Sequence, residues 1–232
     1  MLKRLDGTPP DEPFPGPEEA LPGPEGLIAV GGCLSVPRLL NAYRSGVFPW
    51  FSEGEPVLWW SPDPRWVLRP AALRVSRSLR KRLCREEFTV TYDRDFEAVI
   101  RACAEPRAGA EGTWISDDII GAYLALHRAG YAHSFEAWQS GQLVGGLYGV
   151  ALGRVFFGES MFHRVTDASK IALVTAVERL TVWGYGLIDC QLYTPHLARF
   201  GARALSRRGF VRCLRRSLAD RPDPEAFGGS PR

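Results

Sequence analysis

The chain has 232 residues, of which 45% are hydrophobic, and a formal net charge of +3. This length suits one large domain or two small ones, and the apolar content allows a sizeable core. No apolar run approaches the ~20 residues that a bilayer requires. The N-terminal segment MLKRLDGTPPDEPFPGPEEA lacks the apolar stretch of a signal peptide. These features exclude a membrane-spanning protein, and we expect a cytoplasmic one.

The cysteines and histidines show none of the spacings that are typical of disulfide frameworks or zinc sites. The cysteines are odd in number and scattered, without a CxxC pair. His127 and His133 are poorly spaced for shared ligation on one helix face. We therefore expect no metal site.

Residues 7–25 contain many Pro, Gly and Glu residues and predict an extended or disordered arm. A helix is expected from Ser35 to Gly46. In the following segment, VFPWFSEGEPVLWWSPDPR, Pro and Gly prevent a long regular element. We place a domain boundary at its end. This gives a small N-terminal domain with a Pro-rich arm (1–64), a larger domain (65–220) and a disordered tail (221–232).

The larger domain is predicted to begin with helices capped by Ser76, by Asp93 or Asp95, and by Ser116. The segments HSFEAWQ, QLVGGLYGVA and RVFFGESMF then indicate three antiparallel strands joined by tight turns. A helix, ASKIALVTAVERLTVW, and a buried strand, LIDCQLY, follow. This order predicts an α+β fold with a mostly antiparallel sheet covered by helices.

Basic residues gather in two stretches. A solvated helix face explains one such stretch as well as a phosphate-binding surface does, but two together favour a nucleic-acid partner. The first comprises Arg74, Arg77, Arg80, Lys81, Arg82 and Arg85, and the second Arg199, Arg203, Arg207, Arg208, Arg212, Arg215 and Arg216.

Three polar residues occupy strand positions where apolar residues are expected. Glu159 ends the strand VFFGES, while Asp189 and Gln191 interrupt LIDCQLY. Alternation along a strand places Asp189 and Gln191 on one face and Cys190 on the other. Because a buried carboxylate is costly without a partner, the three residues indicate either a functional site or a structural hydrogen-bond network. The same alternation disfavours a nucleophile–base pair of Cys190 and His196.

Several segments resemble the bacterial leucyl/phenylalanyl-tRNA–protein transferases, in order from about Pro24 to Ala202. They are PEGLIAVGG, LLNAYRSGVFPWFS, LWWSPDPR, EGTWIS, AYLALHRAGYAHSFE, LVGGLYGVALG, FFGESMF, ASKIALV and LIDCQ. The resemblance implies a small N-terminal domain and a catalytic domain with a GNAT-like acyltransferase fold. It implies transfer of Leu, Phe and, less well, Met from aminoacyl-tRNA. The implied acceptors are proteins with N-terminal Arg or Lys, which are thereby marked for degradation in the N-degron pathway.

The resemblance also implies residue roles. Asp189 and Gln191 match the catalytic pair, and Glu159 matches the acidic residue of the same site. Trp50 and Trp114 match aromatic residues around the 3′ adenosine. The implied apolar pocket for the aminoacyl side chain comprises Leu147, Phe156, Met161, Leu173, Ala176 and Ile188. The implied tRNA-facing patch comprises Arg74, Arg77, Arg80, Lys81, Arg82 and Arg85. Ala176 is smaller than expected at its position, which predicts a deeper pocket.

The donor implied by the resemblance is an activated ester, so no ATP, metal or coenzyme A is expected, and the protein is expected to act as a monomer. We expect Asp189, through Gln191, to accept the proton of the attacking amine. In the alternative, both residues position the amine while a ribose hydroxyl carries the proton. Two other classes stay open. One is an acetyltransferase that uses acetyl-coenzyme A, although its R-x-x-G-x-[GA] loop is not found; the other is a tRNA-binding module without catalysis.

Overall fold

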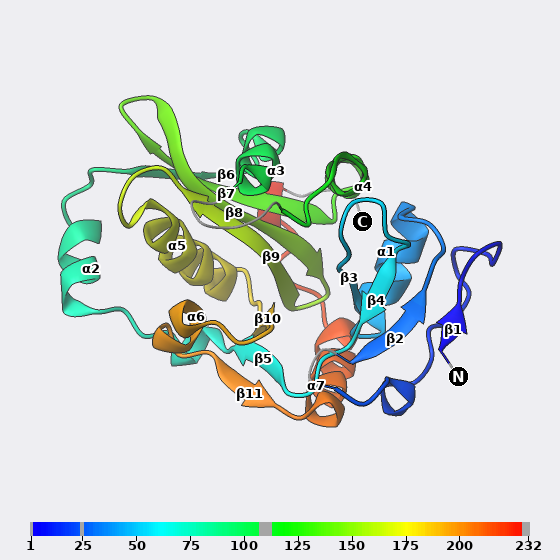
Figure 1. The fold of residues 1–232 in the computed structure, drawn as a ribbon. Helices are drawn as coiled ribbons and strands as arrows, with labels where there is room; N and C mark the ends of the chain where they lie inside the picture. The colour runs from blue at the N-terminus through cyan, green and yellow to red at the C-terminus, as the bar shows by residue number, and fades with distance from the viewer. Residues whose placement is uncertain (1, 24–25, 107–112, 229–232) are drawn as a thin grey trace.

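Two sheets organise the chain, and Figure 1 shows how the helices surround them. The computed structural model describes residues 2–23, 26–106 and 113–228. Within them, a four-stranded sheet has the order β1-β2-β4-β3, and a seven-stranded sheet has the order β11-β5-β10-β9-β8-β7-β6. The smaller sheet ends in sequence with β4 at Trp60, and the larger one begins with β5 at Arg65.

The smaller sheet consists of β1 (Lys3–Arg4), β2 (Leu27–Val30), β3 (Phe48–Pro49) and β4 (Leu58–Trp60). Helix α1 (Val36–Arg44) packs beside it, and η1 (Pro17–Glu19) lies in the arm. The arm is ordered in the described residues, since β1 pairs in parallel with β2. Arg38 explains this order: it is fully buried and donates hydrogen bonds to the backbone carbonyls of Thr8, Pro9 and Glu12. These carbonyls belong to a Pro-rich segment that cannot form a regular ladder of its own.

The larger sheet contains β5 (Arg65–Leu68), β6 (Thr89–Tyr92), β7 (Ala132–Gln139), β8 (Gln142–Leu152), β9 (Val155–His163), β10 (Leu187–Gln191) and β11 (Arg203–Leu205). Strands β7, β8 and β9 form the expected antiparallel meander. Strand β10 lies parallel to β9 and antiparallel to β5, which also pairs with β11. The prediction of a mostly antiparallel sheet is confirmed.

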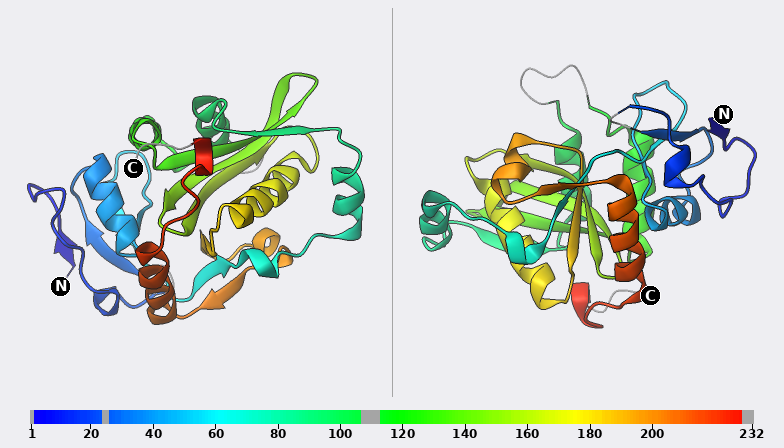
Figure 2. Two further views of the ribbon diagram at one scale, coloured as in Figure 1. Left: turned by 180° about the vertical axis from the view of Figure 1, so that it is seen from behind. Right: turned by 90° about the horizontal axis from the view of Figure 1, so that it is seen from below.

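Helices cover both faces of this sheet (Figures 1 and 2). They are α2 (Arg77–Leu83), α3 (Phe96–Ala104), α4 (Asp117–Arg128), α5 (Ala168–Val182), α6 (Pro195–Arg199) and α7 (Arg207–Ala219); η2 (Pro70–Ala72) follows β5. Helix α5 packs on one face with its own apolar cluster, while α3 and α4 pack on the other with a second cluster. The expected N-caps Ser76, Asp95 and Ser116 each accept a hydrogen bond from the backbone N–H three residues later. No helix in the described residues has the length and apolarity needed to cross a bilayer.

The expected disorder of the tail is wrong for its described part, residues 221–228. The chain turns back so that η3 (Ala226–Gly228) docks on the sheet, with Phe227 only 7% exposed. The Phe227 ring stacks on His133 with 3.7 Å between centroids and also contacts Trp183. Burial of one aromatic ring thus offsets the cost of ordering a polar, Pro-containing segment. Residues 229–232 lie outside the described chain.

Close packing between α5 and the sheet depends on a glycine in β8. A Cβ added at Gly145 would lie 2.6 Å from the Cβ of Ala168 and 2.9 Å from its backbone carbon, at the beginning of α5. We expect Gly145→Ala to reduce the free energy of unfolding by about 1–3 kcal/mol, because the helix must shift. Urea unfolding measures this change.

Gly121 in α4 provides the matched control, since a Cβ there would meet nothing within 4 Å. Gly121→Ala should stabilise the protein by about 0.5–1 kcal/mol through helix propensity alone. Equal effects of the two substitutions would contradict the packing explanation.

Candidate active site

Three polar side chains from distant parts of the chain meet at Glu159, which lies in the middle of β9 and not at a strand end as expected. One carboxylate oxygen, Oε1, accepts hydrogen bonds from the Tyr43 hydroxyl at 2.8 Å and from Gln191 Nε2 at 2.9 Å. The other, Oε2, accepts from the Tyr123 hydroxyl at 2.9 Å. The two tyrosine hydroxyls also lie within hydrogen-bonding distance of each other. Helices α1 and α4 therefore fix the position of a carboxylate carried by the larger sheet.

Burial controls the protonation of this network. It raises the pKa of Glu159 from 4.5 to about 7, against the hydrogen bonds from Tyr43 and Tyr123, which lower it; the nearby charge of Asp189 adds to the rise. Because this value exceeds that of the unfolded chain, the contribution of Glu159 to stability is greatest at low pH and is lost as pH rises through about 7. Burial, followed by the charge of Glu159, raises the pKa of both tyrosines, so they stay hydrogen-bond donors.

Asp189 lies beneath the network in an ion pair with Arg65. Both residues are fully buried. Arg65 Nε and Nη2 donate to the two Asp189 oxygens at 2.9 and 2.6 Å, and Nη1 donates to the Gly46 carbonyl at 3.2 Å. The guanidinium also lies over the rings of Phe48 and Phe210, at 4.8 and 4.5 Å from their centroids. The bidentate geometry and the flanking rings compensate for desolvation of both charges.

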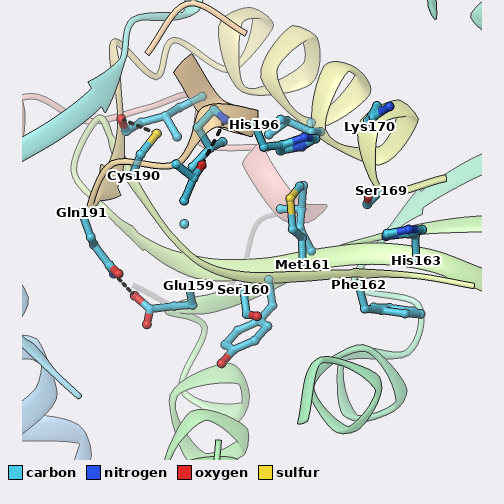
Figure 3. Close-up of a pocket in the computed structure, with 18 of the residues that line it drawn as sticks. Glu159, Ser160, Met161, Phe162, His163, Ser169, Lys170, Cys190, Gln191 and His196 are labelled. Carbon is cyan, nitrogen blue, oxygen red and sulfur yellow. Dashed lines mark hydrogen bonds between the residues drawn. The ribbon is translucent and has the colours of Figure 1, made fainter. Parts of the chain in front are cut away.

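The Asp189 carboxylate also controls the backbone of Gln191. Its Oδ1 accepts a hydrogen bond from the Gln191 backbone N–H at 2.9 Å. Gln191 has a φ of +60°, a left-handed conformation that is uncommon outside glycine. Asp189 thus holds the turn that directs the Gln191 side chain toward Glu159. Figure 3 shows the hydrogen bond between Gln191 and Glu159.

The expected alternation holds along β10 as far as Cys190, which packs with Ile188 in the cluster of α5, whereas Arg65, the partner of Asp189, contacts Phe48 and Phe210 of the other cluster. The pairing register between β10 and β5 then shifts between Asp189 and Gln191. Cys190 and Gln191 both line the cavity (Figure 3). Burial raises the pKa of the Cys190 thiol strongly, and the charge of Asp189 adds to this effect. A protonated thiol is a poor nucleophile, so the disfavoured pairing of Cys190 with His196 gains no support.

A cavity of about 990 Å³ opens beside the network, between β8, β9, β10, α5 and α6. The eight residues that the family resemblance implied for substrate contacts all line it: Trp50, Trp114, Leu147, Phe156, Met161, Leu173, Ala176 and Ile188. Met161 points into it from β9 in Figure 3. Trp50 is 36% exposed, whereas the aliphatic side chains on β8, α5 and β10 are buried. The cavity therefore combines an apolar interior with an open aromatic rim and a polar end.

The basic residues of the first stretch do not line this cavity. Arg77, Arg80 and Lys81 are exposed on α2, a short helix at one end of the molecule (Figure 1). Arg82 is partly neutralised by Asp167 and Glu87, each at 3.5 Å. A surface that binds phosphates through these residues would therefore lie beside the cavity.

Three members of the site, Tyr43, Tyr123 and Arg65, were not predicted from the sequence. Tyr43 and Tyr123 occupy apolar positions of amphipathic helices, and Arg65 closes the SPDPR segment that was interpreted as a domain boundary. One available signal was a charged residue at the first position of a strand whose other residues are apolar.

The fold and the cavity define a class of protein. A helix-covered mixed sheet holds a large apolar cavity, and a carboxylate–amide network marks the polar end of that cavity. This arrangement suits an enzyme that binds an apolar acyl group and brings an amine to it.

Comparison with known proteins identifies the family within that class. Residues 32–63 match the model of the leucyl/phenylalanyl-tRNA protein transferase N-terminal domain, and residues 67–215 match the model of the leucyl/phenylalanyl-tRNA protein transferase itself. The leucyl/phenylalanyl-tRNA–protein transferase of Methylococcus capsulatus is 58% identical over 231 residues, covering 100% of this chain and 98% of that protein. The protein of the same name from Pseudomonas fluorescens is 60% identical over 205 residues, covering 88% and 91%. The chain therefore belongs to the leucyl/phenylalanyl-tRNA–protein transferase family of aminoacyltransferases.

Solved structures resemble the chain less closely. A GCN5-related N-acetyltransferase from Kribbella flavida has a TM-score of 0.39 at 13% identity, covering 72% of this chain and 60% of that one. L-PGS from Bacillus licheniformis has a TM-score of 0.42 at 13% identity, covering 58% and 49%. Scores below 0.5 are too low to define a fold, so the fold class rests on the strand order and helix layers of this chain.

The ion pair between Arg65 and Asp189 makes a prediction about stability. Arg65→Met should reduce the free energy of unfolding by about 3–5 kcal/mol, because it leaves a buried carboxylate unpaired. The double variant Arg65→Met/Asp189→Asn should recover most of this loss, since neither charge remains. Urea unfolding of the single and double variants measures the coupling.

Arg4→Met is the matched control, because Arg4 pairs with Asp6 on the surface, where both side chains are more than half exposed. No measurable change is expected there. Strictly additive losses at Arg65 and Asp189 would show that the two residues are not energetically coupled.

Proposed function

We propose that the protein transfers Leu, Phe and, less well, Met from aminoacyl-tRNA to the α-amino group of proteins that begin with Arg or Lys, and so marks them for degradation. The observation that carries this proposal is the apolar cavity that ends at the hydrogen-bonded pair of Glu159 and Gln191. Membership of an aminoacyltransferase family supports the donor, and the polar end of the cavity supports an amine acceptor.

The donor binds by three contacts of different chemistry. Its apolar side chain enters the cavity between Leu147, Phe156 and Ile188. The 3′ adenine stacks on Trp50 or Trp114 at the rim, where one aromatic contact contributes about 1–3 kcal/mol. The acceptor stem lies against the exposed basic residues of α2, which contact its phosphates.

The acceptor amine is held by Gln191 and Glu159. Because Gln191 Nε2 donates to Glu159, its side-chain carbonyl oxygen is oriented to accept a hydrogen bond from the amine. The nitrogen attacks the ester carbonyl carbon, the bond from that carbon to the ribose oxygen breaks, and a proton passes from the nitrogen to the leaving ribose hydroxyl. The Glu159 carboxylate stabilises the positive charge that develops on the nitrogen during attack.

Asp189 is a positioning residue in this proposal. Its two oxygens are occupied by Arg65 and by the Gln191 backbone, and the side chain is fully buried. Of the two mechanisms left open by the sequence, this geometry favours positioning, with the ribose hydroxyl as the proton carrier.

The proposal predicts which donors react. We expect kcat/KM for Leu, Phe and Met esters of tRNA to exceed those for Ile and Val about 10- to 200-fold, because β-branching widens the side chain next to the reacting ester. The measurement uses charged tRNAs with a peptide that begins with Arg. The same peptide with an acetylated N-terminus is the control and should receive nothing. Equal transfer of Ile and Leu would contradict the assignment of the apolar cavity as the binding site of the aminoacyl side chain.

The proposal also predicts a pH dependence. Below pH 7 the raised pKa keeps Glu159 protonated and neutral, so turnover should rise as pH passes through about 7. Glu159→Gln should abolish this inflection and leave only that of the acceptor amine, at about 7.7–8.0. The measurement is kcat at saturating substrates, corrected for spontaneous ester hydrolysis. An unchanged profile in the variant would show that Glu159 does not titrate during catalysis.

A further inference from the structure

The outer face of α7 carries four arginines. Arg208, Arg212, Arg215 and Arg216 are all exposed, and their spacing of three, four, seven and eight residues places them on one side of the helix. The opposite side buries Phe210, Val211 and Leu214 in the core. The arginine face is therefore a defined stripe on a fixed helix.

Arg207 shows what a structural arginine does on this helix. It is half-buried and donates hydrogen bonds to the carbonyls of Ser61 and Pro17, which ties α7 to the N-terminal part of the chain. By contrast, the side chains of the four exposed arginines form no hydrogen bond, ion pair or ring contact with any described residue. Their charges are thus available to a ligand.

The charge of this region is also uncompensated along the sequence. Residues 195–219 contain seven arginines and no acidic residue, although the whole chain has a net charge of only +3. Like charges three and four residues apart repel one another and destabilise an isolated helix. Burial of the apolar face of α7 explains why this segment is a helix. It does not explain why the exposed side carries arginines, so folding does not account for the stripe.

The stripe continues toward the cavity and α2. Arg203 is exposed on β11, which pairs with β5, and Arg199 is exposed on α6, whose neighbours His196 and Leu197 line the cavity. The segment before α2 bonds to the same region, since the Arg74 backbone N–H donates to the Phe200 carbonyl. In Figure 2, the view from below looks directly at this edge, along which α2, α6, β11 and α7 follow one another.

We propose that the arginine stripe of α7 is a second nucleic-acid contact surface, which binds the phosphate backbone of the aminoacyl-tRNA away from the cavity. The inference rests on the proposed function for the identity of the RNA. Guanidinium groups at helical spacing suit a row of phosphates. Because residues 195–219 contain no acidic residue, salt bridges within this segment cannot neutralise the arginines. The stripe supplies affinity for the body of the RNA, while the cavity selects the amino acid.

The test removes the charges without changing the cavity. In Arg208→Gln/Arg212→Gln/Arg216→Gln, Kd and KM for leucyl-tRNA should rise at least about ten-fold at low salt, with kcat unchanged. The slope of log Kd against log salt concentration should decrease by about two to three, because up to three phosphate contacts are lost. Activity with a short aminoacylated 3′ fragment, which lacks the tRNA body, should not change.

Two matched variants control for charge and folding. Arg94→Gln/Arg101→Gln/Arg128→Gln removes the same charge from the α3 and α4 side and should leave Kd unaltered. Arg208→Lys/Arg212→Lys/Arg216→Lys keeps the charge and should retain most of the binding. If the glutamine variant and the α3/α4 variant bind leucyl-tRNA alike, or if only the KM of the acceptor peptide changes, the proposal is overturned. If the wild type binds RNA with this salt dependence but transfers no amino acid, the proposed function is contradicted, whereas the RNA-binding role of the arginine stripe is supported.

Discussion

The buried ion pair of Arg65 and Asp189 is the interaction on which the site depends. Arg65 belongs to the first strand of the larger sheet, yet it contacts a carbonyl before β3, the ring of Phe48 in β3 and the ring of Phe210 in α7. One guanidinium thus joins the two sheets and the C-terminal helix around a single carboxylate. A buried charge is tolerated only when such partners replace water, so the geometry of the pair and the relative positions of these elements are determined together.

The ion pair of Arg65 and Asp189 also determines which carboxylate is left to bind the Gln191 side chain. Asp189 is engaged by Arg65 and by the Gln191 backbone, so the carboxylate that binds the Gln191 side chain beside the cavity is Glu159. Glu159 in turn depends on Tyr43 and Tyr123, from the neighbouring helices α1 and α4. A carboxylate held by neutral donors in a buried place keeps a pKa near that of the reacting amine.

In the proposed function, recognition is divided between two kinds of surface. The cavity has an apolar interior and would discriminate among side chains by shape over a few methylene groups. The basic faces of α2 and α7 are exposed, and their attraction to phosphates would carry no information about the amino acid. Affinity for the large, charged donor would thus be separate from selectivity for the small group that is transferred.

The sequence by itself determined the order of the elements, because periodicity, N-caps and tight turns are local properties; it predicted the β7–β9 meander, the caps Ser76 and Ser116, and the α+β class. It also singled out Glu159, Asp189 and Gln191, because polar residues in apolar strands are visible without coordinates. Only the tertiary structure decided that Tyr43, Tyr123 and Arg65 join them, that the tail docks through Phe227, and that β10 shifts its register. These features depend on contacts between residues far apart in the chain, and no local pattern encodes which distant partner a buried hydroxyl or guanidinium will find.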